Sequence, residues 1–339
     1  MAYSAIVKPQ DYFNTKLYSG NSSTQSITGV GFAPDFVWIK DRNDTGHHQL
    51  LDAVRGVTKY ISSNDTDAEA TSSNGLTSFN SDGFSLGDNT NYNNSSRIYA
   101  SWNWKANGTG SANTAGDLNS TVSVNTTAGF SIVTYSGTGN FGESVGHGLG
   151  VAPSMIIARR LNGVEDWAVY HKALGASKYI ILNTTGAEQS STSRWGGVAP
   201  TNSVFTVGNN ASVNANGGTH VAYCFAGVQG YSKFGRYDGN NSDDGPFIYT
   251  GFKPAFVIIK SYSTNPWILL DNKRGSYNVN QSKLFPNDSV AENNDTSNGI
   301  DFLSNGLKIR RNNSEINASG TAYIYMAFAE NPLVANSGT

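Results

Sequence analysis

The motif most suggestive of chemistry is Gly-x-Ser-x-Gly at residues 142–146, with His147 directly after it. In hydrolases this motif places a nucleophilic serine on a tight turn between a strand and a helix. Here a glycine-rich stretch precedes the motif and a proline-led apolar run follows it, so neither flanking element fits. A catalytic triad also needs a base and a carboxylate at the same place, and the chain has only five histidines. We therefore predict that Ser144 is not a nucleophile, that the protein is not an enzyme and that it has no catalytic residues.

Three glutamates recur along the chain, each five residues after an asparagine. They are Glu69, Glu188 and Glu292. Glycosidases use two carboxylates about 5 to 9.5 Å apart, which makes a glycan depolymerase the enzymatic alternative. One glutamate per repeat fits a turn or an ion pair better, and Arg55 and Arg274 are candidate partners for the first and third. We therefore assign the glutamates a structural role.

The sequence gives no pattern for a metal or cofactor site. The single cysteine, Cys224, lies in an apolar run, where a thiol is usually inert. The oxygen-rich stretch 65–69 lacks the spacing of a calcium-binding EF-hand. The neighbouring His47 and His48 would point to opposite faces of a strand and could not converge on one ion. We expect no cofactor and no metal.

Three copies of one pattern organise the chain. Each copy has a proline before an apolar run, a second apolar segment, the Asn and Glu pair, and a closing aromatic run. The landmark residues are Pro34, Pro153 and Pro254, Trp167 and Trp267, and Glu69, Glu188 and Glu292. Because the copies keep these positions while the rest of the sequence drifts, we interpret the landmarks as structural.

The elements around the landmarks have the patterns of short β-strands. Residues 36–39 and 256–259 are continuous β-branched and aromatic runs, typical of strands buried on both faces. Residues 78–87 and 302–309 place Asp-Gly or Asn-Gly between short apolar stretches, which predicts hairpins. We therefore predict an all-β chain of three tandem β-sandwich units, jelly-roll-like and about 100 residues each, side by side as separate sandwiches.

The repeats also set the expected domain boundaries. Residues 1–107 form an N-terminal segment and the first β unit, and residues 108–129 form a linker rich in Gly, Asn, Ser and Thr. Residues 130–230 form the second unit, and residues 231–339 form the third unit with a C-terminal tail.

Charge and hydropathy exclude several classes of partner. Lys and Arg number 23 against 25 Asp and Glu, a formal charge of -2, so we expect no nucleic-acid binding. No apolar run approaches the roughly 18 residues of a membrane span, so we expect no membrane insertion. Residues 1–10 lack the apolar core of a signal peptide, so we expect synthesis without export.

One tryptophan has no counterpart in the other copies. Trp195 follows Arg194 in a Gly- and Ser-rich stretch of the second unit. Aromatic rings can stack on the C–H faces of sugars, so we predict Trp195 and Arg194 as a candidate glycan contact. The other tryptophans lie at or beside repeat landmarks, which favours core or inter-unit packing.

Several segments resemble a repeated domain of tailed-phage virion proteins, including those of marine phages and cyanophages. They are residues 18–32 before Pro34, residues 75–87 and residues 230–237, and the resemblance continues through the third copy to residues 327–332. Members of that family are described as tail fibre or virion structural proteins, with no established catalytic residues to carry over.

The resemblance implies a non-enzymatic virion structural protein on the particle exterior, in the tail fibre or as a tail-associated host-attachment component. A capsid decoration or accessory head protein is the alternative, and a glycan depolymerase the second alternative. The expected partners are other virion proteins, further copies of the chain as a homo-oligomer with a trimer as its expected state, and a host surface glycan. The protein would be assembled in the cytoplasm of the host bacterium and then reside in the virion.

Overall fold

The computed structural model describes residues 4–333, and within them nearly all regular structure is β. These residues contain 26 strands, three four-residue α-helices and one short 3-10 helix, η1 (Pro9–Asp11). The paired strands run antiparallel. The prediction of an all-β fold is therefore confirmed.

The first unit has nine strands and α1 (Thr90–Asn93). The strands are β1 (Phe13–Ser19), β2 (Gln25–Thr28), β3 (Phe36–Asp41), β4 (Gln49–Asp52), β5 (Lys59–Ser62), β6 (Ala70–Thr71), β7 (Leu76–Asn80), β8 (Gly83–Leu86) and β9 (Ile98–Trp104). A main sheet has the order β1-β9-β3-β4-β5-β6, and a small sheet has the order β2-β8-β7.

The second unit has ten strands and α2 (Ala211–Asn214). The strands are β10 (Ser111–Asn113), β11 (Ser120–Asn125), β12 (Phe130–Ser136), β13 (Ser144–Gly146), β14 (Met155–Arg160), β15 (Ala168–His171), β16 (Lys178–Ile181), β17 (Gln189–Ser190), β18 (Val204–Thr206) and β19 (Thr219–Phe225). The main sheet has the order β10-β11-β12-β19-β14-β15-β16-β17, and β13 pairs with β18.

The third unit has seven strands and α3 (Ser314–Asn317). The strands are β20 (Ser232–Asp238), β21 (Phe247–Tyr249), β22 (Phe252–Ser261), β23 (Ile268–Asp271), β24 (Ile300–Leu303), β25 (Gly306–Ile309) and β26 (Ala322–Pro332). The main sheet has the order β20-β26-β22-β23, and the small sheet has the order β21-β25-β24. The predicted hairpins are present as β7 with β8 and β24 with β25.

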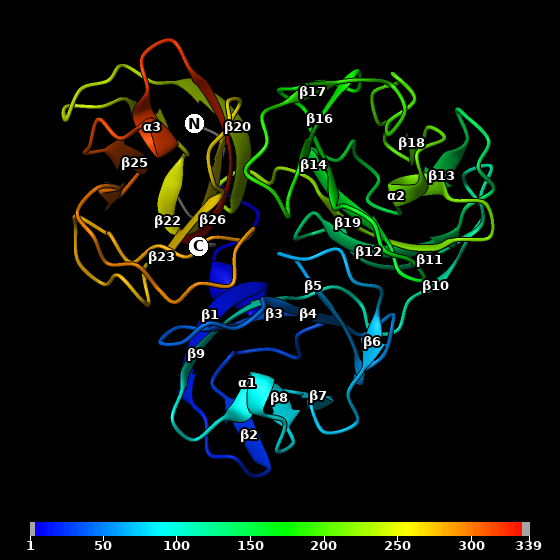
Figure 1. Ribbon diagram of the computed structural model, residues 1–339, viewed down its shortest axis with the longest axis horizontal. Helices are drawn as coiled ribbons and strands as arrows, with labels where there is room; N and C mark the ends of the chain where they lie inside the picture. The colour runs from blue at the N-terminus through cyan, green and yellow to red at the C-terminus, as the bar shows by residue number, and fades with distance from the viewer. Residues whose placement is uncertain (1–3, 334–339) are drawn as a thin grey trace, which may run out of the picture.

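One strand order recurs in the three main sheets: β1-β9-β3-β4, β12-β19-β14-β15 and β20-β26-β22-β23. The three lobes of Figure 1 each contain one of these sheets, and the lobes surround a common centre. In each lobe a hydrophobic cluster lies between the main and the small sheet, which makes each a β-sandwich.

The other face of each main sheet packs into one core at the centre of the molecule. Large side chains from all three units form this central core, among them Phe36, Trp102, Phe130, Tyr223, Phe256 and Phe328. The apolar runs 36–39 and 256–259 are buried throughout because one face of each strand packs within its sandwich and the other in the central core. The sequence predicts separate sandwiches, but in the structure the three sandwiches share this core.

The stretch predicted as a linker, residues 108–129, is instead part of the second unit. It contains β10 and β11, and β11 pairs with β12 along its length. Leu118 and Val122 place apolar side chains in the core of the second sandwich. Their burial stabilises a segment whose Gly, Ser and Thr content alone suggested a flexible connection.

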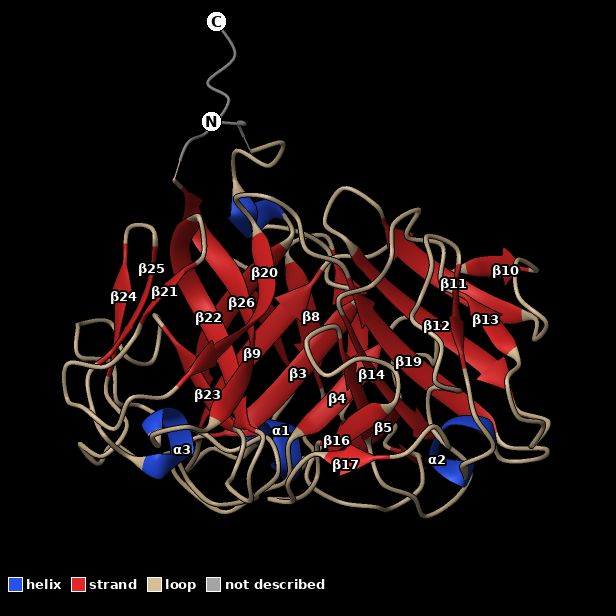
Figure 2. Ribbon diagram, turned by 90° about the horizontal axis from the view of Figure 1, so that it is seen from above, coloured by secondary structure: helices blue, strands red, loops and turns tan. Residues whose placement is uncertain are grey.

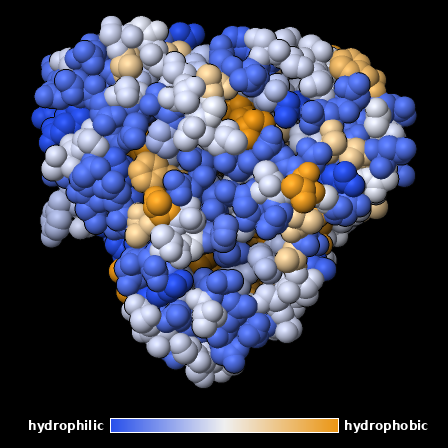
Figure 3. All heavy atoms as spheres, in the orientation of Figure 1, coloured by the Kyte–Doolittle hydropathy of each residue, from blue (hydrophilic) through white to orange (hydrophobic). Residues whose placement is uncertain are grey.

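The molecule has two unlike ends along the direction of view in Figure 1. Figure 2, turned by 90°, places α1, α2 and α3 at one end and η1 at the other. The side of the molecule seen in Figure 3 is largely hydrophilic, with apolar residues in small separate patches.

Candidate functional site

The boundaries between adjacent units, here called the 1–2, 2–3 and 3–1 seams, use the same backbone contact. At each seam a landmark glutamate donates its backbone N–H to a carbonyl of the next unit. The pairs are Glu69 to Leu161 (2.7 Å), Glu188 to Tyr262 (2.9 Å) and Glu292 to Arg42 (2.8 Å). Trp167 and Trp267 also donate their indole N–H across a seam, to the carbonyls of Ser62 (2.7 Å) and Ile181 (2.9 Å). The repeated residues therefore join the three units into a ring.

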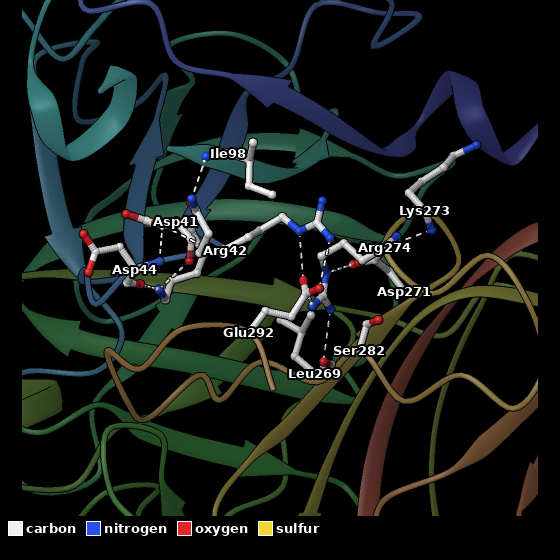
Figure 4. Close-up of polar contacts among 12 residues, drawn as sticks. Asp41, Arg42, Asp44, Ile98, Leu269, Asp271, Lys273, Arg274, Ser282 and Glu292 are labelled. Atoms are coloured by element: carbon white, nitrogen blue, oxygen red, sulfur yellow. Dashed lines mark hydrogen bonds and ion pairs between the residues drawn. The ribbon is translucent and has the colours of Figure 1, made fainter. Parts of the chain in front are cut away.

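The glutamate side chains form ion pairs, as predicted for the first and third copies. Arg55 Nη1 lies 3.1 Å from Glu69 Oε2, and Arg274 Nη1 lies 3.0 Å from Glu292 Oε2. Arg42 from the first unit also binds Glu292 through two hydrogen bonds of 2.8 and 2.9 Å, which Figure 4 shows beside Arg274. At the 3–1 seam the landmark glutamate is therefore held by two arginines, one from each of the two units.

Burial and charge act in opposite directions on Glu292. Burial favours the neutral acid, but the hydrogen bonds and charges of Arg42 and Arg274 outweigh it and lower the pKa of Glu292. Glu292 is therefore a carboxylate held between two guanidinium groups, an arrangement that stabilises a boundary between units rather than offering a reactive acid.

A second layer of polar contacts lies deeper in each seam. Asp52 Oδ2 accepts a hydrogen bond from the Tyr223 hydroxyl (2.8 Å), and Asp271 Oδ2 accepts one from Trp102 Nε1 (3.0 Å). The second unit has His171 at the matching position, and its Nε2 lies 3.3 Å from the Tyr325 carbonyl oxygen. These groups are buried and point across the seams.

The landmark prolines are buried at the start of the central strands. Pro34 lies two residues before the start of β3, and Pro153 lies two residues before the start of β14. Pro254 lies inside β22. The pairing of β22 with β26 shifts register on both sides of Pro254. Because proline has no N–H to give to the ladder, a bulge is the position where a sheet tolerates it.

The structure corrects the predicted glycan contact. Trp195 is only 1% exposed and packs edge-on against Tyr170 and Phe205 in the core of the second sandwich. Arg194 is also buried, with its guanidinium 3.8 Å from the centre of the Tyr179 ring. Neither side chain offers the open ring face that stacking on a sugar requires. Trp195 is unique to the second unit because it fills that unit's own core.

The Gly-x-Ser-x-Gly motif does not assemble a triad. Ser144 lies on β13, and its hydroxyl donates to Asp117 Oδ2 (2.7 Å). His147 is buried and directs its ring nitrogens at the Thr201 carbonyl and the Leu149 N–H. Ser144 thus bonds to a carboxylate in a loop and has no hydrogen bond to the histidine.

One cavity is lined by two carboxylates, Asp65 and Asp67, and has a volume of about 150 Å³. Asp65 pairs with His47 (3.2 Å) and lies 3.6 Å from a guanidinium nitrogen of Arg159. These contacts tie Asp65 to its turn and to the 1–2 seam, so nothing here favours the depolymerase alternative.

A larger groove lies at the 2–3 seam, and its lining includes the first and last described residues, Ser4 and Leu333. Its cavity of about 390 Å³ is lined by Lys172 of the second unit and by Lys233, Tyr249 and Gly251 of the third, among others. Lys233 Nζ donates to the Tyr249 carbonyl (2.7 Å) and lies 5.0 Å from the centre of the Tyr249 ring. The lining therefore combines two cationic groups with an aromatic ring.

Comparison with known proteins assigns the family and leaves its activity open. The family model described as "Domain of unknown function (DUF7483)" matches residues 8–332. The chain belongs to this family. No curated protein and no solved structure matches the family member described here.

Three further findings concern the described part of this DUF7483 protein. Among residues 4–333, no three His, Cys, Asp or Glu side chains group in a way that could hold a metal ion. Within the same residues, no helix is long and apolar enough to cross a membrane. Cys224 is fully buried, and burial raises the pKa of its thiol well above the usual range.

The groove at the 2–3 seam was missed by the sequence analysis, although a signal was present. Phe247 and Tyr249 alternate with buried Ile248, so β21 carries two exposed aromatic residues on one face. In the first unit the matching strand, β2, carries Ser26 and Thr28 at these positions. Aligning the repeats by their small sheets, instead of by their landmarks alone, would have singled out this strand.

Proposed function

We propose that this DUF7483 protein is a non-enzymatic structural protein on the exterior of a tailed-phage virion. Within the virion, it serves in the tail fibre or as a tail-associated host-attachment component. The resemblance of its repeats to phage virion proteins supplies the class, and other virion proteins and a host surface glycan are its partners.

The observation that carries the proposal is the use made of the repeated residues. The repeated residues make hydrogen bonds that join the three sandwiches around one buried core. They are Glu69, Glu188, Glu292, Trp167 and Trp267. A body closed by buried bonds on every seam suits a protein that must keep its shape outside the cell. Binding is then left to the surface of a rigid scaffold.

The capsid decoration alternative is favoured by a separate observation. The three lobes repeat one strand order around a common centre, so one chain presents a shape close to threefold symmetry (Figure 1). Such a body fits a local threefold position of a shell, where three similar surfaces would each make a weak contact.

Immunogold electron microscopy of intact particles tests the proposal, with antibodies raised against the purified chain. We expect gold at the tail of each particle, and no gold when the antibodies are first absorbed with the purified chain. Gold distributed over the capsid would replace the tail assignment with the decoration role. If mass spectrometry of purified particles detects no copy of the chain, the virion proposal is wrong.

A further inference from the structure

Among residues 4–333, no acid forms an ion pair with the positively charged side chains of the groove at the 2–3 seam. Lys172 and Lys233 line it, and no carboxylate belongs to its described lining. Neither lysine makes an ion pair with any of residues 4–333. Burial first, and then the charge of Lys172, lower the pKa of Lys233, so Lys172 lies near enough to repel the Lys233 ammonium group. An anion bound between them would relieve this repulsion.

The wall of the groove continues as an aromatic strip along β21. Tyr249 is 50% exposed and Phe247 is 47% exposed. Alternate residues of a strand lie on one face about 6.6 Å apart, so the two rings follow each other along the strand. The ring of Phe247 lies over Gly306 of β25, where an added Cβ would come within 2.9 Å of it. This contact supports the ring while it stays exposed.

The other two seams act as internal comparisons, because sheet register fixes the matching positions. Lys172, Lys233 and Tyr249 at the 2–3 seam correspond to Asn272, Asn14 and Thr28 at the 3–1 seam, and to Ala53, Ser131 and Gly146 at the 1–2 seam. Neither of the other seams has a charged or aromatic residue at any of these positions. The fold alone therefore does not require the two lysines and the tyrosine.

We propose that this groove is a binding site for an acidic saccharide, a sugar chain bearing carboxylates. A sugar ring stacks on Tyr249, the next along the chain reaches Phe247, and a carboxylate pairs with Lys172 and Lys233. The cavity accommodates about one to two sugar rings of such a chain, and the strip beyond it extends the contact. The inference deepens the proposed host-attachment function by naming the ligand class and its site.

Binding of tetragalacturonate to the purified full chain, measured by isothermal titration calorimetry, tests the site directly. Its methyl ester is the matched probe, because it keeps the sugar backbone and loses the charge. We expect the ester to bind at least about tenfold more weakly, and tetragalacturonate to bind more weakly as salt is raised. Equal binding of the two probes, or no binding of tetragalacturonate, would overturn the proposal. Binding of glucose 6-phosphate, with no binding of tetragalacturonate, would also overturn it.

The variants install residues that the other units carry at the same positions. Tyr249→Thr, Lys172→Ala and Lys233→Asn each remove one proposed contact, and we expect each to weaken tetragalacturonate binding about five- to tenfold. The controls are Tyr277→Ala, which removes a tyrosine that is 85% exposed outside the groove, and Lys59→Ala, which removes a lysine of the first unit. Unchanged affinity in the three groove variants, with folding verified by circular dichroism, would refute the site.

The outcome separates this inference from the proposed function. Failure of the purified chain to bind removes the saccharide site but leaves the location on the particle to be decided by gold labelling. Binding by the purified chain, with no copy present in particles, would keep the site and remove the virion role.

Discussion

Burial distinguishes residues that the sequence shows as equivalent. Glu292 and Glu188 occupy the same place in two repeats, and both donate their backbone N–H across a seam. The Glu292 side chain is 6% exposed between two arginines, whereas Glu188 is 24% exposed and pairs with Lys178, which is 37% exposed. A buried pair loses more than an exposed one when a partner is removed, because the remaining charge is left without compensation.

Glu292→Gln should therefore lower the free energy of unfolding by about 3 kcal/mol, since Arg42 and Arg274 keep their charges without the carboxylate. Glu188→Gln, the matched control, should lower it by less than about 1 kcal/mol because both side chains of its pair are more exposed than Glu292. Urea unfolding followed by tryptophan fluorescence measures both. Equal losses in the two variants would show that the 3–1 seam gains nothing from its second arginine.

Some side-chain contacts could be predicted from the sequence, and others could not. Arg55 and Arg274 were candidate ion-pair partners of Glu69 and Glu292 in the sequence, and both pairs are present. Trp195 was placed at the surface because no other copy has it, yet it is buried. A residue with no counterpart in the other repeats has a role in one unit only, but this does not show whether its side chain lies in the core or on the surface of that unit.

At the scale of elements, each short helix is fixed by two asparagines four residues apart. Asn89, Asn210 and Asn313 cap α1, α2 and α3 through their side-chain oxygens. Asn93, Asn214 and Asn317 are fully buried at the last helical residue. Asn317 accepts from the Asn240 N–H (2.9 Å) and donates to the carbonyls of Ser242 and Arg311 (2.7 and 3.0 Å). One side chain thus joins α3 to two loops.

Asn317→Ala should lower the free energy of unfolding by about 3 kcal/mol, because it removes three hydrogen bonds of a fully buried side chain, one from the Asn240 N–H and two to the carbonyls of Ser242 and Arg311. Asn313→Ala removes a single cap bond, from the Glu315 N–H, and should lower it by about 1 kcal/mol. Urea titration of the two variants beside the parent chain gives the comparison. A smaller loss for Asn317→Ala than for Asn313→Ala would mean that the loops satisfy their own backbone groups.

The elements themselves were largely predictable, but their packing was not. Turn residues and apolar alternation indicated the hairpins at 78–87 and 302–309, and continuous apolar runs indicated strands covered on both faces. Those runs cannot specify what covers the second face. In this protein it is the other two units. Phe13 and Phe256, for example, pack with ring centroids 5.3 Å apart although they are more than 200 positions apart in the sequence. No local pattern reports a contact over that distance.

At the scale of the whole molecule, the shared core means that the stability of each unit depends on its packing against the other two. Phe13, Trp104, Phe256 and Phe328 form a cluster of rings at the 3–1 seam, with centroids 4.9 to 6.2 Å apart. Opening one seam would expose such surfaces on two units at once. Titratable groups that lie on the seams should therefore have the largest effect on how the free energy of unfolding changes with pH.

Two buried histidines, one of them on the 2–3 seam, make the folded chain sensitive to acid. Burial lowers the pKa of His171 to about 4 and that of His48 well below its usual value. Each is thus neutral in the folded chain at a pH where the unfolded chain binds a proton, so the folded state loses stability as pH falls below about 6.5. The loss continues to about pH 4 and amounts to about 2 to 3 kcal/mol for His171. Asp35 and Asp41 act in the opposite direction, because burial raises their pKa.

His171→Gln should remove the His171 contribution, because a glutamine stays neutral at every pH and keeps a donor that can reach the Tyr325 carbonyl. The free energy of unfolding of this variant should fall less steeply between pH 6.5 and 4 than that of the parent chain. Trp267→Phe is the control, since it removes a hydrogen bond across the same seam without changing a titratable group, so it should lower stability but leave the slope unchanged. Urea unfolding at half-unit pH steps measures the slopes. Parallel curves for the parent and His171→Gln would show that the ring opens in acid through groups other than this seam histidine.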